Sequence, residues 1–323
     1  MMKNLLKPIA VFIVLTALFT SCRKDDKLID NTNSFDALMA KYKIKGQVFT
    51  INGATGGTII GTGGSKITFP ANALVNGDGS PFSGDATITI KEALKKSDWL
   101  TEGLSATTVN NILVSGGMLD IKVQRKDNGA NLLPAPIMRE PNQDPKAVIM
   151  GEVIKPRVKQ QDLQLFLPDN TTSTPATDPP SAWTSASYYP FGNGTNSYIF
   201  QIPQFRWVNC DGLYNQPGVK TTIKVTPDLS AFAGASNIQA ILVYRDINTV
   251  ITLPPSPGFF QSYSNSIAEG SIADVICIGK TADGKILFKV MPAVTFTTNM
   301  NIAITPQVAN ATDVSAYLDS INN

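Results

Sequence analysis

The sequence predicts a mainly β protein with two antiparallel β-sandwich-like domains and short N- and C-terminal helices. Short runs of alternating polar and apolar residues, such as Thr87-Ile88-Thr89-Ile90, are separated by turns that contain glycine. No amphipathic run of helical length lies between these strands, which excludes the crossover connections of a parallel sheet. The chain has 323 residues. The part that follows an N-terminal leader, roughly 300 residues, is enough for two domains.

In the first half, the strand pattern begins at residue 47. We expect strands at residues 47–51, 58–60, 66–69, 86–91 and 118–124. Residues 95–103 follow neither the strand nor the helix period and are expected to be irregular. Residues 133–145 contain four prolines among polar residues, which is typical of an extended connector. The N-terminal sandwich is therefore predicted to occupy residues 45–147.

The second half repeats this pattern and predicts a C-terminal sandwich-like domain at residues 148–323. The expected strands lie at residues 148–154, 163–167, 197–202, 205–208, 221–225, 238–244, 249–253, 272–278, 286–290 and 301–305. Residues 169–180 are rich in Thr, Pro, Ser and Asp, the composition of an exposed loop. Residues 282–285 predict a tight hairpin turn.

Two short helices are predicted near the ends of the folded part. Ser34 is placed to cap the first helix and Thr312 to cap the second, which closes the chain. Their apolar positions, at helical spacing, are Phe35, Leu38, Met39 and Tyr42 in the first and Val314, Tyr317, Leu318 and Ile321 in the second.

Residues 1–21 have the layout of a lipoprotein signal peptide. Lys3 and Lys7 form a positive start, and the apolar run at 9–19 is shorter than the roughly 20 residues that span a bilayer. The small Ser21 precedes Cys22, as in lipoproteins whose cysteine thiol receives a diacylglyceryl group and whose new amino terminus is acylated. We therefore predict lipidation of Cys22 and firm attachment to a membrane. The alternative is an ordinary secretory signal with a chance cysteine.

The tract after Cys22 bears on where the anchored protein faces. Arg23-Lys24-Asp25-Asp26-Lys27 resembles the export signal of surface lipoproteins of the Bacteroidota, in which a basic residue and paired acids follow the lipidated cysteine. The resemblance implies an outer-membrane protein displayed on the cell surface, with residues 22–44 forming a lipidated tether and the short helix. The alternative is an anchor that faces the periplasm.

Several internal segments resemble known proteins. The run from Ile67 to Leu74, Ile-Thr-Phe-Pro-Ala-Asn-Ala-Leu, follows a double glycine and resembles the β-sandwich of ankyrins and netrin receptors. A family of Bacteroidota lipoproteins is more similar, through Ser97-Asp98-Trp99-Leu100, Ser115-Gly116-Gly117-Met118 and Phe205-Arg206-Trp207-Val208-Asn209-Cys210-Asp211. This resemblance implies a fold, a location and protein contacts, and it implies no chemistry.

Composition excludes several classes of function. The sequence contains no His, which removes the Ser-His-Asp triad, the Cys-His dyad and most catalytic zinc sites. Without Lys3 and Lys7, 25 basic residues face 25 acidic ones, and no basic stripe indicates nucleic-acid binding. The glycine-rich run at residues 61–64 is followed by no Lys-Ser or Lys-Thr, so it does not predict a phosphate loop. We expect no catalytic residues, no metal and no cofactor.

Two cysteines, Cys210 and Cys277, lie beyond the lipidation site. An exported compartment is oxidising, and both cysteines lie in expected strands, so a disulfide between them is one interpretation. Two free, buried thiols are the other.

Aromatic residues gather among Ser, Gly, Asn and Pro in one segment, at Trp183, Tyr188, Tyr189 and Phe191. Exposed rings with polar neighbours can stack on sugars, which would make this segment a ligand-binding platform. The alternative is that these rings fill the core of a sandwich and cover its end.

These observations predict a non-enzymatic lipoprotein that binds or scaffolds envelope or extracellular proteins at the outer membrane. The alternative function is glycan capture in a nutrient-uptake system. The two differ in whether the aromatic rings of residues 183–191 lie on an open face.

Overall fold

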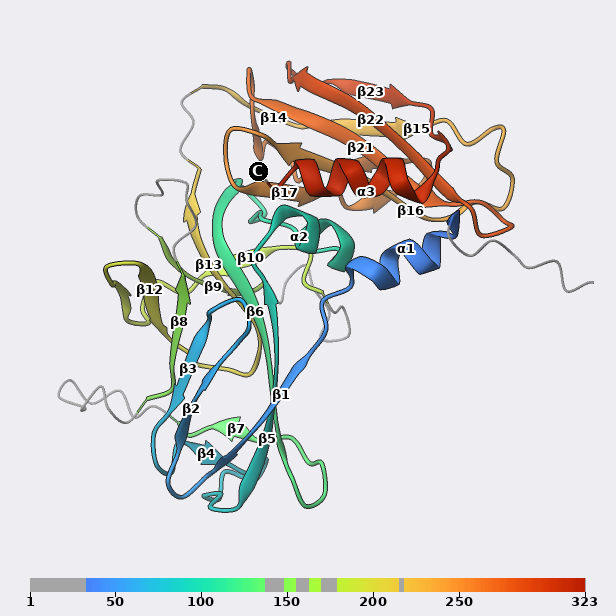
Figure 1. Cartoon of the computed structure of the whole chain (residues 1–323). Coiled ribbons are helices and arrows are strands. Elements are labelled where there is room, and N and C mark those ends of the chain that lie inside the picture. The colour runs from blue at the N-terminus through green and yellow to red at the C-terminus, as the bar shows by residue number, and fades with distance from the viewer. Residues whose placement is uncertain (1–32, 137–147, 155–162, 170–178, 215–217, 323) are drawn as a thin grey trace, which may run out of the picture.

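In the computed structural model of the chain, the described residues are 33–136, 148–154, 163–169, 179–214 and 218–322 (Figure 1). They form several antiparallel sheets and three short helices, which confirms the predicted mainly β, sandwich-like fold. The predicted signal peptide, Cys22 and the first part of the tether lie outside the described residues. Within the described ranges, no helix has the length and apolar character needed to cross a membrane.

The first sandwich consists of a six-stranded and a five-stranded sheet. The six-stranded sheet has the order β1 (Gln47–Asn52), β5 (Asp85–Ala93), β6 (Leu113–Arg125), β13 (Arg206–Leu213), β9 (Gln164–Pro168) and β10 (Trp183–Ser185). The five-stranded sheet has the order β11 (Phe191–Asn193), β12 (Ser197–Gln201), β8 (Met150–Ile154), β3 (Lys66–Phe69) and β2 (Gly57–Ile60). A small pair, β4 (Leu74–Val75) and β7 (Leu133–Pro134), lies at one end of this sandwich (Figure 1).

The second sandwich also has two main sheets. Its five-stranded sheet has the order β17 (Thr249–Thr252), β16 (Ser236–Tyr244), β21 (Ile272–Lys280), β22 (Ile286–Thr295) and β24 (Gln307–Val308). Its four-stranded sheet has the order β18 (Pro255–Ser256), β19 (Phe259–Gln261), β15 (Lys224–Pro227) and β23 (Asn301–Ile304), and β15 and β23 are parallel. A short pair, β14 (Lys220–Thr221) and β20 (Ile267–Ala268), accompanies them.

The predicted domain boundary between residues 147 and 148 is wrong. Strands β8 to β13 all follow residue 147, yet they complete the two sheets of the first sandwich. The first sandwich therefore extends to β13, and the second begins at β14. The physical reason is that the long strand β6 offers a free edge to β13, and antiparallel strands pair across any separation in sequence.

The helices differ in how well the sequence predicts them. Helix α1 (Phe35–Tyr42) forms as expected, and the Ser34 side chain accepts the Ala37 N–H at 3.0 Å. Helix α3 (Ala311–Ser320) has Asn310 at its N-cap, where Thr312 was expected. Helix α2 (Lys96–Glu102) was not expected, because its seven residues are too few to show a period.

Three hydrophobic cores hold the described residues together. Each sandwich has a core between its sheets, and a third core lies between the two sandwiches and the helices. The third core contains all three tryptophans, Trp99, Trp183 and Trp207, each 2% exposed or less. Burying such large rings contributes several kcal/mol of hydrophobic free energy, so the two sandwiches form one packed body.

Helix α1 is attached to the second sandwich, although it precedes the first in sequence. The Phe35 N–H donates to the Gly284 carbonyl at 3.0 Å, and Asp36 pairs with Lys280 at 3.1 Å. At the start of α3, the Ala311 N–H donates to Asn33 Oδ1 at 3.0 Å. The chain therefore enters the described structure beside the second sandwich before it crosses to the first (Figure 1).

Candidate functional site

The four aromatic residues expected to form a ligand platform do not share an open face. Trp183 is fully buried between the sandwiches, where its Nε1 donates to the Ser105 carbonyl at 2.6 Å. Phe191 packs on the first core, with its ring centroid 6.3 Å from that of Phe200. Tyr188 is 63% exposed and lies 4.4 Å from the half-buried Tyr189 ring. The platform prediction is therefore wrong for Trp183, because β10 turns this side chain toward the second sandwich.

The two cysteines beyond the lipidation site are free thiols. Cys210 on β13 lies in the core of the first sandwich, and Cys277 on β21 lies in the core of the second. A disulfide between them is excluded by this separation into different cores, so the interpretation of two buried thiols is the one that holds. Burial raises the pKa of Cys277 to about 12, and burial together with the neighbouring Asp211 raises the pKa of Cys210. Neither thiol is activated as a nucleophile.

Two of the three sequence segments that carry the lipoprotein resemblance lie on paired strands, β6 and β13. Asp211 on β13 is opposite Ser115 on β6, and Asn209 is opposite Met118, with a register shift between them. Asn209 Nδ2 donates to Asp211 Oδ2 at 2.6 Å, and Ser115 Oγ donates to Asn209 Oδ1 at 3.3 Å. Gly116 is required here, because a Cβ at this position would lie 2.7 Å from the Cys210 carbonyl oxygen.

This polar cluster connects the two sandwiches. The Ser115 N–H donates to the Asn248 carbonyl at 2.9 Å, and Asn248 Nδ2 donates back to the Ser115 carbonyl at 2.7 Å. Burial raises the pKa of Asp211 to about 7, although hydrogen bonds from Ser115, Asn209 and Gly116 oppose the shift. The carboxyl group is fully buried, so it positions the junction and does not reach a substrate.

A second buried carboxylate, Glu92, occupies the glycine-rich loop at residues 61–64. The backbone N–H groups of Gly63 and Ser65 donate to its two oxygens at 2.8 and 2.9 Å, and Gln47 Nε2 donates at 2.8 Å. A Cβ at Gly61 would lie 2.4 Å from Glu92 Oε2, so only glycine fits. The loop therefore binds an anion, as glycine-rich loops do, but the anion is a side chain of the protein itself.

A hollow of about 610 Å³ is lined by residues of the loop after β4 and of the turn after β6. Both segments lie at the end of the first sandwich that is away from the helices (Figure 1). Asn76, Phe82 and Asp85 line the hollow on one side, and Arg125 and Lys126 line it on the other. We call this region the tip. The loop after β4 and the turn after β6 bring these residues together from distant parts of the chain.

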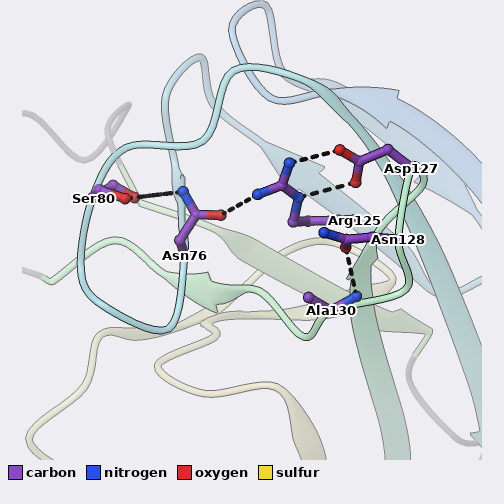
Figure 2. Close-up of polar contacts among 6 residues, drawn as sticks. All are labelled: Asn76, Ser80, Arg125, Asp127, Asn128 and Ala130. Carbon is purple, nitrogen blue, oxygen red and sulfur yellow. Dashed lines mark hydrogen bonds and ion pairs between the residues drawn. The ribbon is translucent and has the colours of Figure 1, made fainter.

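Arg125 is the best-positioned charged group of the tip. Its Nε and Nη2 donate to the two carboxylate oxygens of Asp127 at 3.0 and 2.6 Å, and Nη1 lies 3.4 Å from Asn76 Oδ1 (Figure 2). Its guanidinium carbon lies 5.4 Å from the centre of the Phe82 ring. The hydrogen bond to Arg125 lowers the pKa of Asp127, and the same bond raises that of Arg125.

The tip has the chemistry of a small recognition site. Three of the five guanidinium N–H groups have the partners just described, which leaves donors that can bind a carboxylate. Lys126 adds a second cation, while Asp85 and Asp127 balance the charge. The sequence analysis did not identify this site; the available signal was an Arg two residues before the Asp of the Asp127-Asn128-Gly129 turn.

Neither a metal cluster nor a match to known proteins adds to this description. Among the described residues, no group of three or more His, Cys, Asp or Glu side chains is placed to hold a metal ion. No protein-family model matches the chain, and no curated protein matches it.

Proposed function

We propose that this protein is a lipid-anchored outer-membrane lipoprotein, exposed on the cell surface, that binds a protein partner without catalysis. The observation that carries the proposal is the arrangement of the two ends. Helix α1, which follows the predicted tether, is attached to the second sandwich, whereas the tip lies at the opposite end of the first (Figure 1). An anchor at Cys22 would thus leave the tip open to a partner.

The surroundings of the reactive groups support a non-catalytic role. Both thiols and Asp211 are buried, and burial raises their pKa values. A nucleophile or general base has to contact a substrate, and these groups contact only other parts of the protein. The sequence-based prediction of binding or scaffolding is the function that fits this distribution.

The tip favours a protein ligand that carries a carboxylate beside an apolar group. The carboxylate would accept hydrogen bonds from the free N–H groups of Arg125, and the apolar group would contact Pro81 and Phe82. The near-neutral charge of the tip does not suit a polyanion such as nucleic acid.

Location and binding are tested together in intact cells. Cys22→Ala is expected to release the chain from the membrane fraction, and protease added to intact cells is expected to degrade the wild type. A photo-crosslinking residue at Ser83 should give a discrete adduct that Arg125→Ala reduces about tenfold and that Lys122→Ala, on the polar face of β6, leaves unchanged. Protection of the chain from the protease would contradict surface display. An adduct that Arg125→Ala does not reduce would contradict binding at the tip.

Glycan capture remains the second candidate, because the Tyr188 and Tyr189 rings lie together and Tyr188 is exposed. Binding on a glycan array by the wild-type chain but not by Tyr188→Ala would favour it. Trp183→Ala is unsuitable for this test, since it would open a cavity in the core between the sandwiches.

A further inference from the structure

The outer face of the five-stranded sheet in the first sandwich carries an ordered row of four side chains. Ile199 on β12 is opposite Glu152 on β8, Glu152 is opposite Lys66 on β3, and Lys66 is opposite Ile60 on β2. The row therefore reads apolar, acidic, basic, apolar across four neighbouring strands. We call it the charged row.

The charged row is held in place but remains accessible. Lys66 Nζ and Glu152 Oε2 lie 3.0 Å apart, and Ser197 Oγ donates to Glu152 Oε1 at 2.5 Å. Ile60 is 62% exposed and Ile199 is 36% exposed, and they belong to a hollow of about 870 Å³. Among the described elements, β2, β3, β8 and β12 contact chiefly one another, β11, and the strands β1 and β6 of the facing sheet.

Exposed isoleucines on a sheet face are unusual, and here they are joined by a third. Ile154 lies two positions after Glu152, and therefore on the same face of β8; it is 52% exposed and lines the same hollow. The outer face of the other sheet of this sandwich carries Thr89 and Lys122 in the corresponding row, with a single exposed apolar residue, Val48, opposite Thr89. Three exposed isoleucines that line one hollow, against one exposed valine on the other face, favour the isoleucine-bearing face as an interaction surface.

We propose that the charged row is a self-association surface, which packs against the same row of a second copy of this chain. A two-fold axis that runs along the strands, midway between β3 and β8, reverses the order of the row. Reversal places Ile60 opposite Ile199 of the second copy and Lys66 opposite Glu152. The row is thus complementary to itself in both charge and hydrophobicity, as an isologous interface requires.

The physical cost of this interface is low. Lys66 and Glu152 already form an ion pair within each copy, so less side-chain conformational entropy is lost when the two copies associate. Two facing pairs form an alternating square of four charges, in which each ion has two opposite neighbours. Four strands at about 4.8 Å spacing give a row about 14 Å wide, and the adjoining row of Thr58, Thr68 and Met150 extends it.

Charge reversal provides a sharp test, because it separates self-association from any other use of this face. The full chain, purified in a nonionic detergent, is expected to sediment as a dimer at micromolar concentration. Lys66→Glu alone places four carboxylates together, and Glu152→Lys alone places four ammonium groups together. Each variant should dimerise at least about tenfold more weakly than the wild type. An equimolar mixture of the two variants should recover the dimer, because their rows complement each other.

Two further variants distinguish loss of the interface from loss of folding. Ile60→Asp is expected to weaken the dimer, whereas Val48→Asp, which changes a residue of similar exposure (66%) on β1, is expected to leave it unchanged. Unchanged circular dichroism would show that each variant is folded. A wild-type chain that is monomeric at about 100 μM would overturn the proposal, as would a mixture that fails to recover the dimer. Either result would assign the face to a different protein or to another segment of this chain.

Discussion

Glu92 and Asp211 are two carboxylates of the first sandwich that are both withdrawn from solvent, with exposed fractions of 7% and 0%. Their pKa values nevertheless move in opposite directions. Burial would raise the pKa of Glu92, but hydrogen bonds from Gln47, Gly63 and Ser65 outweigh it, and the pKa is lowered. For Asp211 burial prevails, and the pKa is raised to about 7.

The difference comes from the balance between burial and hydrogen bonding at each group. Glu92 lies inside a glycine loop, where the absence of Cβ atoms lets two N–H groups approach its oxygens at 2.8 and 2.9 Å, and the Gln47 amide donates at 2.8 Å. These distances are typical of charge-assisted hydrogen bonds. Asp211 follows a register shift in a continuous sheet and also receives hydrogen bonds, from Ser115, Asn209 and Gly116. Asp211 is completely buried, however, so the cost of desolvating its charged form exceeds what these hydrogen bonds offset.

The largest effect is expected from removing the carboxylate in the loop. Glu92→Ala leaves the Gln47, Gly63 and Ser65 donors without an acceptor, and we expect the free energy of unfolding to fall by about 3 kcal/mol. Urea denaturation at pH 7 measures this loss. Glu92→Gln, which keeps one oxygen acceptor, should lose roughly half as much. A loss below about 1 kcal/mol for Glu92→Ala, the size of an ordinary surface substitution, would show that the donors find other partners.

A smaller effect of the opposite sign is expected for Asp211→Asn. The folded-state pKa of about 7 lies above the unfolded value, so the folded state holds the proton more tightly. Stability from this group is fully present below about pH 4 and is lost as pH rises toward 7, at up to about 1.4 kcal/mol per pH unit. Asparagine does not ionise, so the variant should be more stable than the wild type by roughly 2 kcal/mol at pH 8.

Chemical denaturation across pH 5 to 8 distinguishes Asp211 from other buried groups. Burial, with the nearby Arg245, lowers the pKa of Lys96 to about 8, so its contribution makes stability rise between about pH 8 and 10 and lies outside this window. If the wild type and Asp211→Asn fell in parallel between pH 5 and 7, the proton would have to be assigned to a group other than Asp211.

The sequence predicted most of the fold because its signals are local. Alternation in strands such as β5, the Ser34 cap and the helical spacing of Val314 and Leu318 depend only on neighbouring residues. The sandwich to which a strand belongs, by contrast, is decided by residues that are distant in sequence. Residues 126–205 separate β13 from β6, and no periodicity in either strand specifies their pairing. The boundary at residue 147 failed for this reason.

The candidate sites likewise combine features that are visible in the local sequence with features that depend on distant parts of the chain. Asp211 and Ser115 were visible as parts of two separate segments, but only the pairing of β6 with β13 brings them together. The burial of Trp183 depends on the second sandwich, which a local composition of Ser, Gly and aromatics does not reveal. The charged row had a local signal: two consecutive isoleucines, Ile59 and Ile60, cannot both face the core of one sheet.

The smallest expected effect belongs to Gln47, which links the loop to β1. Its Nε2 donates to Glu92 Oε2 at 2.8 Å, and its Oε1 accepts the Thr62 N–H at 2.7 Å. Gln47→Ala removes one of the donors that keep Glu92 ionised, so we expect a loss of about 1 kcal/mol at pH 7. The lowered pKa of Glu92 should also rise, so that stability is lost at a higher pH during acidification.

Thr50→Ala is the matched control for this change, because Thr50 is exposed on the same strand. It should shift neither the acid transition nor stability at pH 7 by more than a few tenths of a kcal/mol. If Gln47→Ala lowered stability without moving the acid transition, the backbone N–H groups of Gly63 and Ser65 alone would suffice to keep Glu92 charged. The contrast with Asp211 would then rest on the deeper burial of Asp211, since side-chain and backbone donors are also present there, at Asn209 and Gly116.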